Sequence, residues 1–126
     1  MGATLLAAAQ RHVASAKGCA DTDPEGAYAL AYDAARKAST GLLAHQGLRP
    51  TTTGGHLSVV EATRAQFPEV PGLRSLDRLR RRRNQAEYPD AAGYDPIIKD
   101  EVLEAIEVAE EACSSATKLL DVLGVF

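Results

Sequence analysis

The stretch Arg80–Pro89, with the sequence RRRRNQAEYP, constrains the fold of this chain more than any other. Leucines recur before it at helical spacing from Leu73 onward, which predicts an amphipathic helix. Pro89 disfavours the α conformation in the residue before it, so we predict that the helix ends at Tyr88. Consecutive arginines on a helix point in different directions, and those directions decide what each of them can contact.

A helical wheel divides the polar residues of this segment between two faces. The face that carries the leucines also carries Arg80, Arg83, Asn84 and Glu87. The opposite face has the pattern of a solvated surface and carries Arg74, Arg78, Arg81, Arg82 and Gln85. A guanidinium on a packing face costs several kcal/mol unless it finds a partner or an opening. Pairs one turn apart, Arg83 with Glu87 or Arg80 with Asn84, are one interpretation, and a cleft that binds an anion is the other.

The pattern Arg83-Asn84-x-x-x-Tyr88 resembles the signature of HEPN domains, small all-helical modules of bacteria and eukaryotes. In that signature an Arg, commonly followed by Asn, Asp or His, precedes a His near the end of one helix. The segment from Tyr28 to Leu43 is similar to the tyrosine- and alanine-rich second helix of the family. Thr53–Leu57 is similar to the entry into its next helix, so the resemblance runs from about residue 25 to the C-terminus.

In the family that the chain resembles, the Arg and the His act on RNA without a metal ion. The Arg stabilises the scissile phosphate, the His acts as acid or base, and the ribose 2′-hydroxyl is the nucleophile. The resemblance implies the catalytic candidates Arg83, Asn84 and Tyr88, and the RNA- or phosphate-binding candidates Arg80, Arg83, His56 and Glu87. It implies neither a metal ion nor a cofactor.

Tyr88 stands where the family has its histidine. A phenol with a pKa of about 10 is almost wholly protonated at neutral pH, so it is a poor acid–base catalyst there. His12 or His56 could supply the missing group only if the fold brought one of them near Arg83. We therefore expect a degenerate site whose activity is in doubt.

Three functions follow from these residues. The first is a HEPN-like module that binds RNA, a nucleotide or a partner protein through an arginine-rich cleft at a homodimer interface. The second is an active metal-independent endoribonuclease of the toxin type, paired with a nucleotidyltransferase antitoxin, and the third is a purely structural dimeric bundle. The resemblance also implies that a partner nucleotidyltransferase could modify a tyrosine near the motif, for which Tyr88 and Tyr94 are the candidates.

The length of 126 residues predicts a single domain, 1–126. Hydrophobic residues make up 45% of the chain and charged residues 25%, as in ordinary globular proteins, and no apolar run approaches the ~20 residues that span a bilayer. The N-terminus lacks the pattern of a signal peptide, so we expect a cytoplasmic location. Cys19 and Cys113 stand far apart, which argues against a disulfide framework or a zinc site.

Charge is divided unevenly along the chain. Residues 1–84 hold 12 Lys and Arg against 7 Asp and Glu, whereas residues 85–126 hold 2 against 10. The formal net charge of −3 argues against a general nucleic-acid binder. The asymmetry predicts an acidic last helix that lies beside, or partly neutralises, the arginine cluster. Its acidic stripe is otherwise expected to face solvent and comprises Asp100, Glu104, Glu107 and Glu111.

Helical periodicity predicts four long helices, one short helix and no strands. Besides the arginine helix, these are expected at 3–17, 24–45 and 56–67, and from the Asp95-Pro96 pair to about Leu123. Both Asp23-Pro24 and Asp95-Pro96 have the pattern of an N-cap followed by proline in the first turn. The expected fold class is all-α, an antiparallel up-and-down four-helix bundle with an additional short helix.

The core of this bundle is expected to be rich in small residues. In the second helix the inward line is Tyr28, Ala31, Tyr32, Ala35, Ala38, Ser39 and Leu42. In the last helix the seam is Ile98, Val102, Ala105, Ala109, Ala112, Ala116, Leu119 and Leu123. His12 falls beside the apolar stripe of the first helix, where it is expected to be a packing histidine.

Overall fold

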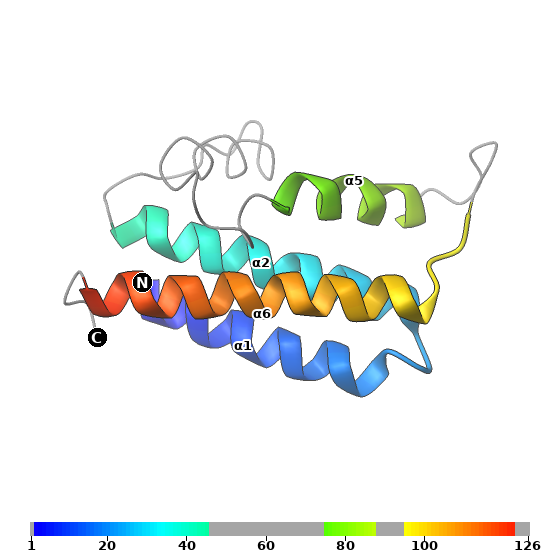
Figure 1. Ribbon diagram of the computed structural model, residues 1–126, viewed down its shortest axis with the longest axis horizontal. Coiled ribbons are helices and arrows are strands. Elements are labelled where there is room, and N and C mark those ends of the chain that lie inside the picture. Colours follow the sequence, from blue (N-terminus) through cyan, green and yellow to red (C-terminus); the bar gives the residue numbers. More distant parts are fainter. Residues whose placement is uncertain (1, 46–74, 88–94, 123–126) are drawn as a thin grey trace.

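The computed structural model describes residues 2–45, 75–87 and 95–122. Within these ranges the chain forms four helices and no strand, so the all-α prediction is confirmed. They are α1 (Gly2–Cys19), α2 (Pro24–His45), α5 (Leu76–Glu87) and α6 (Lys99–Val122). The four described helices alternate in direction, as expected for an up-and-down bundle (Figure 1). The predicted helix at 56–67 lies outside the described residues.

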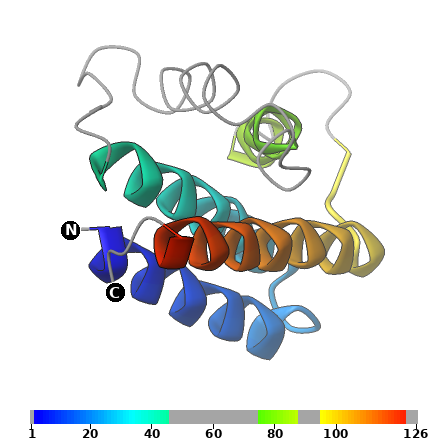
Figure 2. The same ribbon diagram turned by 60° about the vertical axis from the view of Figure 1, so that its left-hand side comes forward.

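Helix α2 lies at the centre of the arrangement. It packs against α1, α6 and α5, and α1 also packs against α6. Helix α5 lies on the side of α2 that faces away from α1 (Figures 1 and 2). One buried hydrophobic cluster joins all four described helices. Within the described residues, no helix is long and apolar enough to cross a membrane.

Small residues bring α1 and α2 close together, as predicted. The buried residues of α2 are mostly alanines, namely Ala27, Ala31, Ala34, Ala35 and Ala38. A Cβ added at Gly41 would lie 3.0 Å from the backbone oxygen of Gly2, so α2 near its end lies very close to the start of α1. A larger residue at position 41 would require the two helices to move slightly apart.

The start of α2 confirms the predicted cap. Asp23 accepts a hydrogen bond at Oδ1 from the backbone N–H of Gly26, at 3.0 Å, and Pro24 is the first helical residue. A Cβ at Gly26 would lie 2.1 Å from Asp23 Oδ2. Glycine at this position therefore leaves space for the capping carboxylate.

The start of α6 differs from the prediction. Residues 95–98 are not helical, and the cap is formed at Ile98, whose backbone N–H donates to Glu101 Oε2 at 3.1 Å. This is the half of a capping box in which the acidic residue of the first turn reaches back to the cap. Because Ile98 precedes the helix, it does not lie in the seam, and it is 57% exposed. The seam is buried from Val102 to Ala116, while Leu119 and Leu123 have no described side chain.

Candidate functional site

Helix α5 is fixed by its leucines. Leu76 and Leu79 are completely buried in the common core, and burial of each such side chain contributes about 1.5–3 kcal/mol. Arg80 and Arg83 follow on the same side of the helix and are half-buried, as is Asn84. The leucine face thus turns these polar side chains toward the rest of the protein.

Arg83 reaches back to α2. Its Cζ lies 5.6 Å from the centroid of the Tyr32 ring, within the range of a cation–π contact. Tyr32 itself is completely buried. The guanidinium is therefore held against an aromatic surface of a neighbouring helix and is restricted in where it can point.

Arg80 pairs within its own helix, but not with the residue that the sequence suggested. Its Nε and Nη2 donate to Asp77 Oδ1 at 3.3 and 3.1 Å, and Arg81 Nη2 lies 3.0 Å from Asp77 Oδ2. The predicted pairing of Arg80 with Asn84 is replaced by this pairing with Asp77. Asp77 is 8% exposed, and a buried carboxylate is stabilised by paired cations. Its spacing of three and four residues from the arginines was a visible signal for these pairs.

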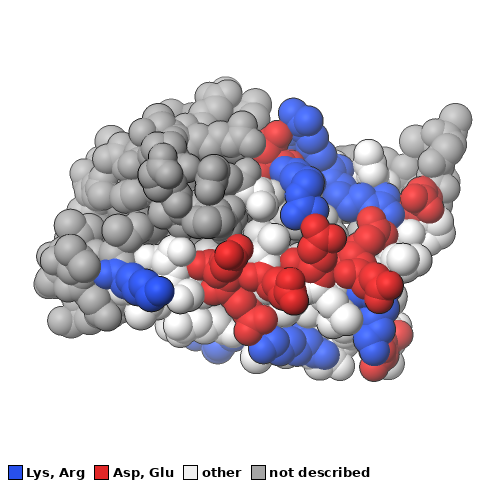
Figure 3. Space-filling view, viewed as in Figure 1, with Lys and Arg blue, Asp and Glu red and all other residues white. Residues whose placement is uncertain are grey.

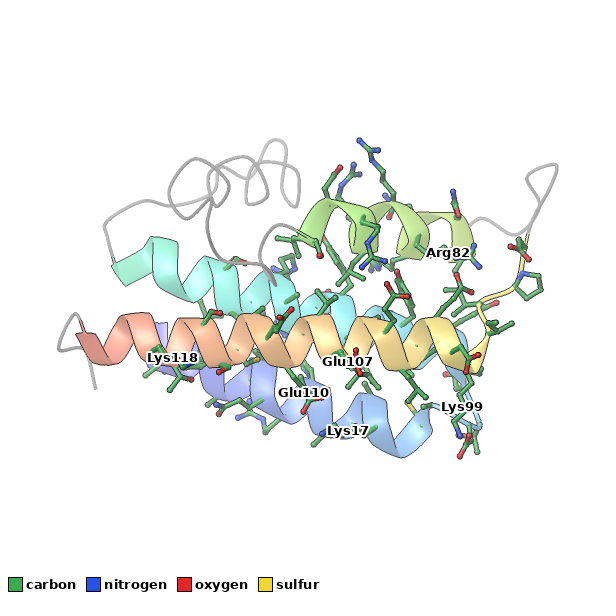
Figure 4. All side chains as sticks on the ribbon, viewed as in Figure 1. Lys17, Arg82, Lys99, Glu107, Glu110 and Lys118 are labelled. Carbon is green, nitrogen blue, oxygen red and sulfur yellow. The ribbon has the colours of Figure 1, made fainter. Side chains whose placement is uncertain are left out.

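Arg82 was predicted to lie on the solvated face of its helix, but the structure shows that its side chain is largely buried. Its side chain is only 15% exposed and lies between α5 and the start of α6 (Figure 4). Nε and Nη2 donate to Glu101 Oε1 and Oε2 at 2.9 and 3.1 Å, and Nη1 donates to Gln85 at 3.1 Å. The hydrogen bonds from Arg82 hold the pKa of Glu101 below its usual value, and Glu101 raises the pKa of Arg82. Arg82 therefore joins two helices.

The acidic helix lies beside the arginines, as the charge asymmetry predicted. Arg78 Nη1 lies 3.0 Å from Glu104 Oε1, so one member of the predicted acidic stripe meets the cluster. Figure 3 shows the basic side chains of α5 next to the acidic side chains of α6. Farther along α6, Glu110 pairs with Lys17 of α1 at 2.9 Å (Figure 4). The pairs of Arg78 with Glu104 and of Arg82 with Glu101 therefore balance positive charge of α5 where it faces α6.

Three arginines lie near Tyr32 where α5 packs on α2, and two of them are paired with carboxylates, Arg36 with Asp33 and Arg80 with Asp77. Burial is the main cause that raises the pKa of Tyr32, and three guanidinium groups oppose it, those of Arg36, Arg83 and Arg80. Arg36 and Tyr32 are one turn apart on α2, whereas the other two arginines come from α5. The structure thus brings Arg36 into this group, although the sequence analysis did not select it. Arg36 and Arg80 are far apart in the sequence, so no local pattern connects them. Their proximity follows from the packing of α5 on α2.

Of the remaining candidate residues, the structure describes a side chain only for His12. His56, Tyr88 and Tyr94 lie outside the described residues, as does the side chain of Glu87. His12 Nε2 lies 2.5 Å from Lys37 Nζ of α2, and burial, followed by the charge of Lys37, lowers the pKa of its ring. The neutral imidazole can therefore accept a hydrogen bond from Lys37, which agrees with a packing role.

Metal ligands do not gather in the described parts of the chain. No three His, Cys, Asp or Glu side chains come together there in a way that could hold a metal ion. Cys113 is buried in the core, and burial raises its pKa to about 11, so the thiol stays protonated at neutral pH. Cys19 and Cys113 are both free thiols.

Comparison with protein families gives a match over nearly the whole chain. The family model described as HEPN domain matches residues 3–120. Neither the comparison with curated proteins nor that with solved structures found a match.

Proposed function

This chain belongs to the HEPN domain family, and on that premise we propose that it binds the phosphate groups of RNA through the Arg80 and Arg83 face of α5. The binding is non-catalytic, because Tyr88 occupies the position where the family signature has a histidine. In this proposal two copies of the chain form a homodimer, and the arginine face borders the cleft between them.

The observation that carries the proposal is the position of Arg83, whose guanidinium lies against the Tyr32 ring of α2 while half-buried Arg80 lies on the same face of α5. A guanidinium presents a planar set of donors that matches the oxygens of a phosphate. The contact between Arg83 and the Tyr32 ring restricts the arginine before any ligand arrives. Such pre-organisation lowers the ordering cost of binding.

The pKa values of the described tyrosines support binding over cleavage. Acid–base catalysis at neutral pH needs a group with a pKa near the working pH. Burial raises the pKa of Tyr28 to about 12 and also raises that of Tyr32. Neither phenol can serve as a base at neutral pH, and His12 is engaged with Lys37 between α1 and α2.

Fluorescence anisotropy with labelled single-stranded RNA in EDTA tests the proposal. We expect the affinity of the wild-type protein to fall steeply with salt, because bound cations release counterions from the phosphates. Arg83→Ala should weaken binding about 10- to 100-fold, which corresponds to the loss of one charge-assisted hydrogen bond. Arg11→Ala, a change at an exposed arginine of α1, serves as the control and should leave affinity unchanged.

The same proteins distinguish RNA binding from endoribonuclease activity and from a purely structural role. Equal affinity of the wild-type and Arg83→Ala proteins would contradict the proposal. RNA that is cut in EDTA by the wild-type protein but not by Arg83→Ala would instead identify an active endoribonuclease. If Arg83→Ala converts a dimer to a monomer in light scattering and the wild-type protein binds no RNA, the bundle is structural.

A further inference from the structure

A groove follows α6 where it packs against α1, and its lining comes from these two helices. Between α1 and α6 the surface has a hollow of about 300 Å³, lined by Gln10, Val13, Glu110, Cys113, Ser114 and Thr117. The side chains of Val13 and Cys113 are buried, so they form an apolar floor. A second hollow of about 550 Å³ continues along α6 and shares Glu110 and Ser114 with the first. We call the two hollows together the α6 groove.

Carboxylates surround the second hollow. Its lining consists of Glu104, Glu107, Val108, Glu110, Glu111 and Ser114, and Figure 3 shows acidic side chains along this face of α6. Glu104 pairs with Arg78 and Glu110 with Lys17, but exposed pairs of this kind contribute little and leave their carboxylates accessible. Glu107 and Glu111 are exposed and form no ion pair with any described residue. The groove therefore keeps a net negative charge.

Leu103 extends the same face of α6 with an apolar side chain. It is 45% exposed, and no other large hydrophobic side chain that the structure describes in α6 is exposed. Leu103, Glu107, Glu110 and Ser114 follow one another at intervals of four and three residues, so they lie along one face of the helix. At a rise of about 1.5 Å per residue this face spans about 17 Å, which is the length of about three turns of another helix.

We infer that the α6 groove is the docking site for a basic amphipathic helix of a partner protein. Lysine or arginine side chains of such a helix complement the charges of Glu107 and Glu111, which have no counterion among the described residues. Its apolar side chains contact Leu103 and the floor formed by Val13 and Cys113. The inference goes beyond RNA binding, because this face attracts cations and repels phosphate.

The groove favours a helix over other cationic ligands. Within the described ranges there is no strand whose edge could pair with an extended peptide, so side chains have to supply the contacts. A helix presents its side chains at the same three- and four-residue spacing as this face of α6. In the described parts of the chain the carboxylates do not gather closely enough to hold a metal ion, and a row of separated charges fits a row of lysines or arginines better.

Fluorescence anisotropy with a labelled synthetic peptide tests the docking site. The probe has about 12 residues, enough for three helical turns, with lysines on one face and leucines on the other. Its control carries glutamates in place of the lysines. We expect the lysine peptide to bind the wild-type protein with an affinity that falls as salt screens the charges, and the glutamate peptide not to bind.

Two double variants separate the groove from the net charge of the protein. Glu107→Gln with Glu111→Gln removes two charges of the groove, so peptide binding should weaken about 4- to 25-fold. Asp21→Asn with Asp100→Asn removes two exposed carboxylates outside the groove and should leave the affinity within about twofold of the wild-type value. Ser114→Arg places a cation in the wall that both hollows share and should abolish binding. Each changed position is exposed, and circular dichroism melting verifies that the variants fold.

Nuclear magnetic resonance locates the bound peptide. The methyl signals of Val13 and Thr117 should shift in step with saturation, because both residues line the groove. No binding of the lysine peptide to the wild-type protein, equal weakening by the two double variants, or methyl signals that stay in place would overturn the inference. Loss of a wild-type dimer in the variant with Glu107→Gln and Glu111→Gln would assign the groove to a second copy of the chain. Displacement of the peptide by equimolar spermine would assign it to a polyamine, and either result overturns the inference as well.

Discussion

Arg83 of α5 places its guanidinium over the ring of Tyr32 of α2, with Cζ 5.6 Å from the ring centroid. This contact connects α5 to the central helix α2. Arg36 lies one turn from Tyr32 on the same face of α2. The aromatic ring therefore has a structural role and an orienting role. The first contributes to folding, and the second controls the direction of the group that we propose contacts phosphate.

Replacing Tyr32 separates these two roles. Tyr32→Leu removes the aromatic face and leaves a smaller side chain in a completely buried position, so we expect a loss of about 2–4 kcal/mol in the free energy of unfolding. Tyr32→Phe keeps the ring and should retain RNA affinity. Urea denaturation and anisotropy measure the two effects. RNA binding that survives Tyr32→Leu without change would show that the ring does not orient Arg83.

A substitution at Asp77 should lower the stability of the protein and raise its affinity for RNA. Asp77→Asn removes the carboxylate that pairs with Arg80 and Arg81, so we expect the free energy of unfolding to fall by about 1–3 kcal/mol. The same change leaves the positive charge of Arg80 unbalanced, so RNA affinity should rise and the salt dependence should steepen. Weaker binding by a folded Asp77→Asn protein would mean that the carboxylate positions Arg80 for its ligand.

The pairing of Glu101 with Arg82 should make the stability of the protein depend on pH. The pKa of Glu101 is lowered in the folded protein, chiefly by hydrogen bonds from Arg82. The stabilisation is therefore present above the unfolded-state pKa of about 4.3 and is lost as the pH falls through the lower folded-state value. Glu101→Gln should destabilise the protein by about 1 kcal/mol at pH 7, because solvent screens the partly exposed carboxylate, and by less at pH 3. Urea unfolding across this range measures the difference, and a difference that stays constant with pH would contradict the prediction that the charge of Glu101 causes it.

Tyr88 provides a gain-of-function prediction that rests on the family signature. Tyr88→His restores a residue with a pKa near 6.5, which can act as acid or base at neutral pH. We expect this variant to cleave RNA slowly in EDTA, and the double variant with Arg83→Ala to be inactive. Gel analysis of labelled RNA measures both. A Tyr88→His protein that binds RNA but never cleaves it would indicate that the site lost more than its histidine.

Much of the fold followed from periodicity, because burial of an apolar stripe depends on spacing along one helix. The inward line of α2 from Tyr28 to Ser39 was predicted correctly for this reason, as was the burial of Leu76 and Leu79 in α5. The predicted position of the α6 cap was wrong because two local patterns competed. The Glu101 carboxylate accepts a hydrogen bond from the N–H of Ile98, so the cap lies three residues after the predicted cap at Asp95.

The candidate site was harder to predict, since its residues meet across helices. A helical wheel assigned Arg82 to solvent, yet a long side chain at the edge of α5 reaches Glu101 of α6. Arg36 was missed because its relation to Arg83 depends on how α5 packs on α2. A wheel orders residues around their own helix and contains no information about the neighbouring one.

The most direct test of this account is the nuclear magnetic resonance signal of the Arg83 Nε–H group during titration with single-stranded RNA. Assignment by comparison with Arg83→Ala identifies the signal, and exposed Arg11 supplies an internal reference. We predict that the Arg83 signal shifts in step with saturation while the Arg11 signal stays in place. An Arg83 signal that remains unchanged when RNA is bound would contradict the central claim that this guanidinium contacts phosphate.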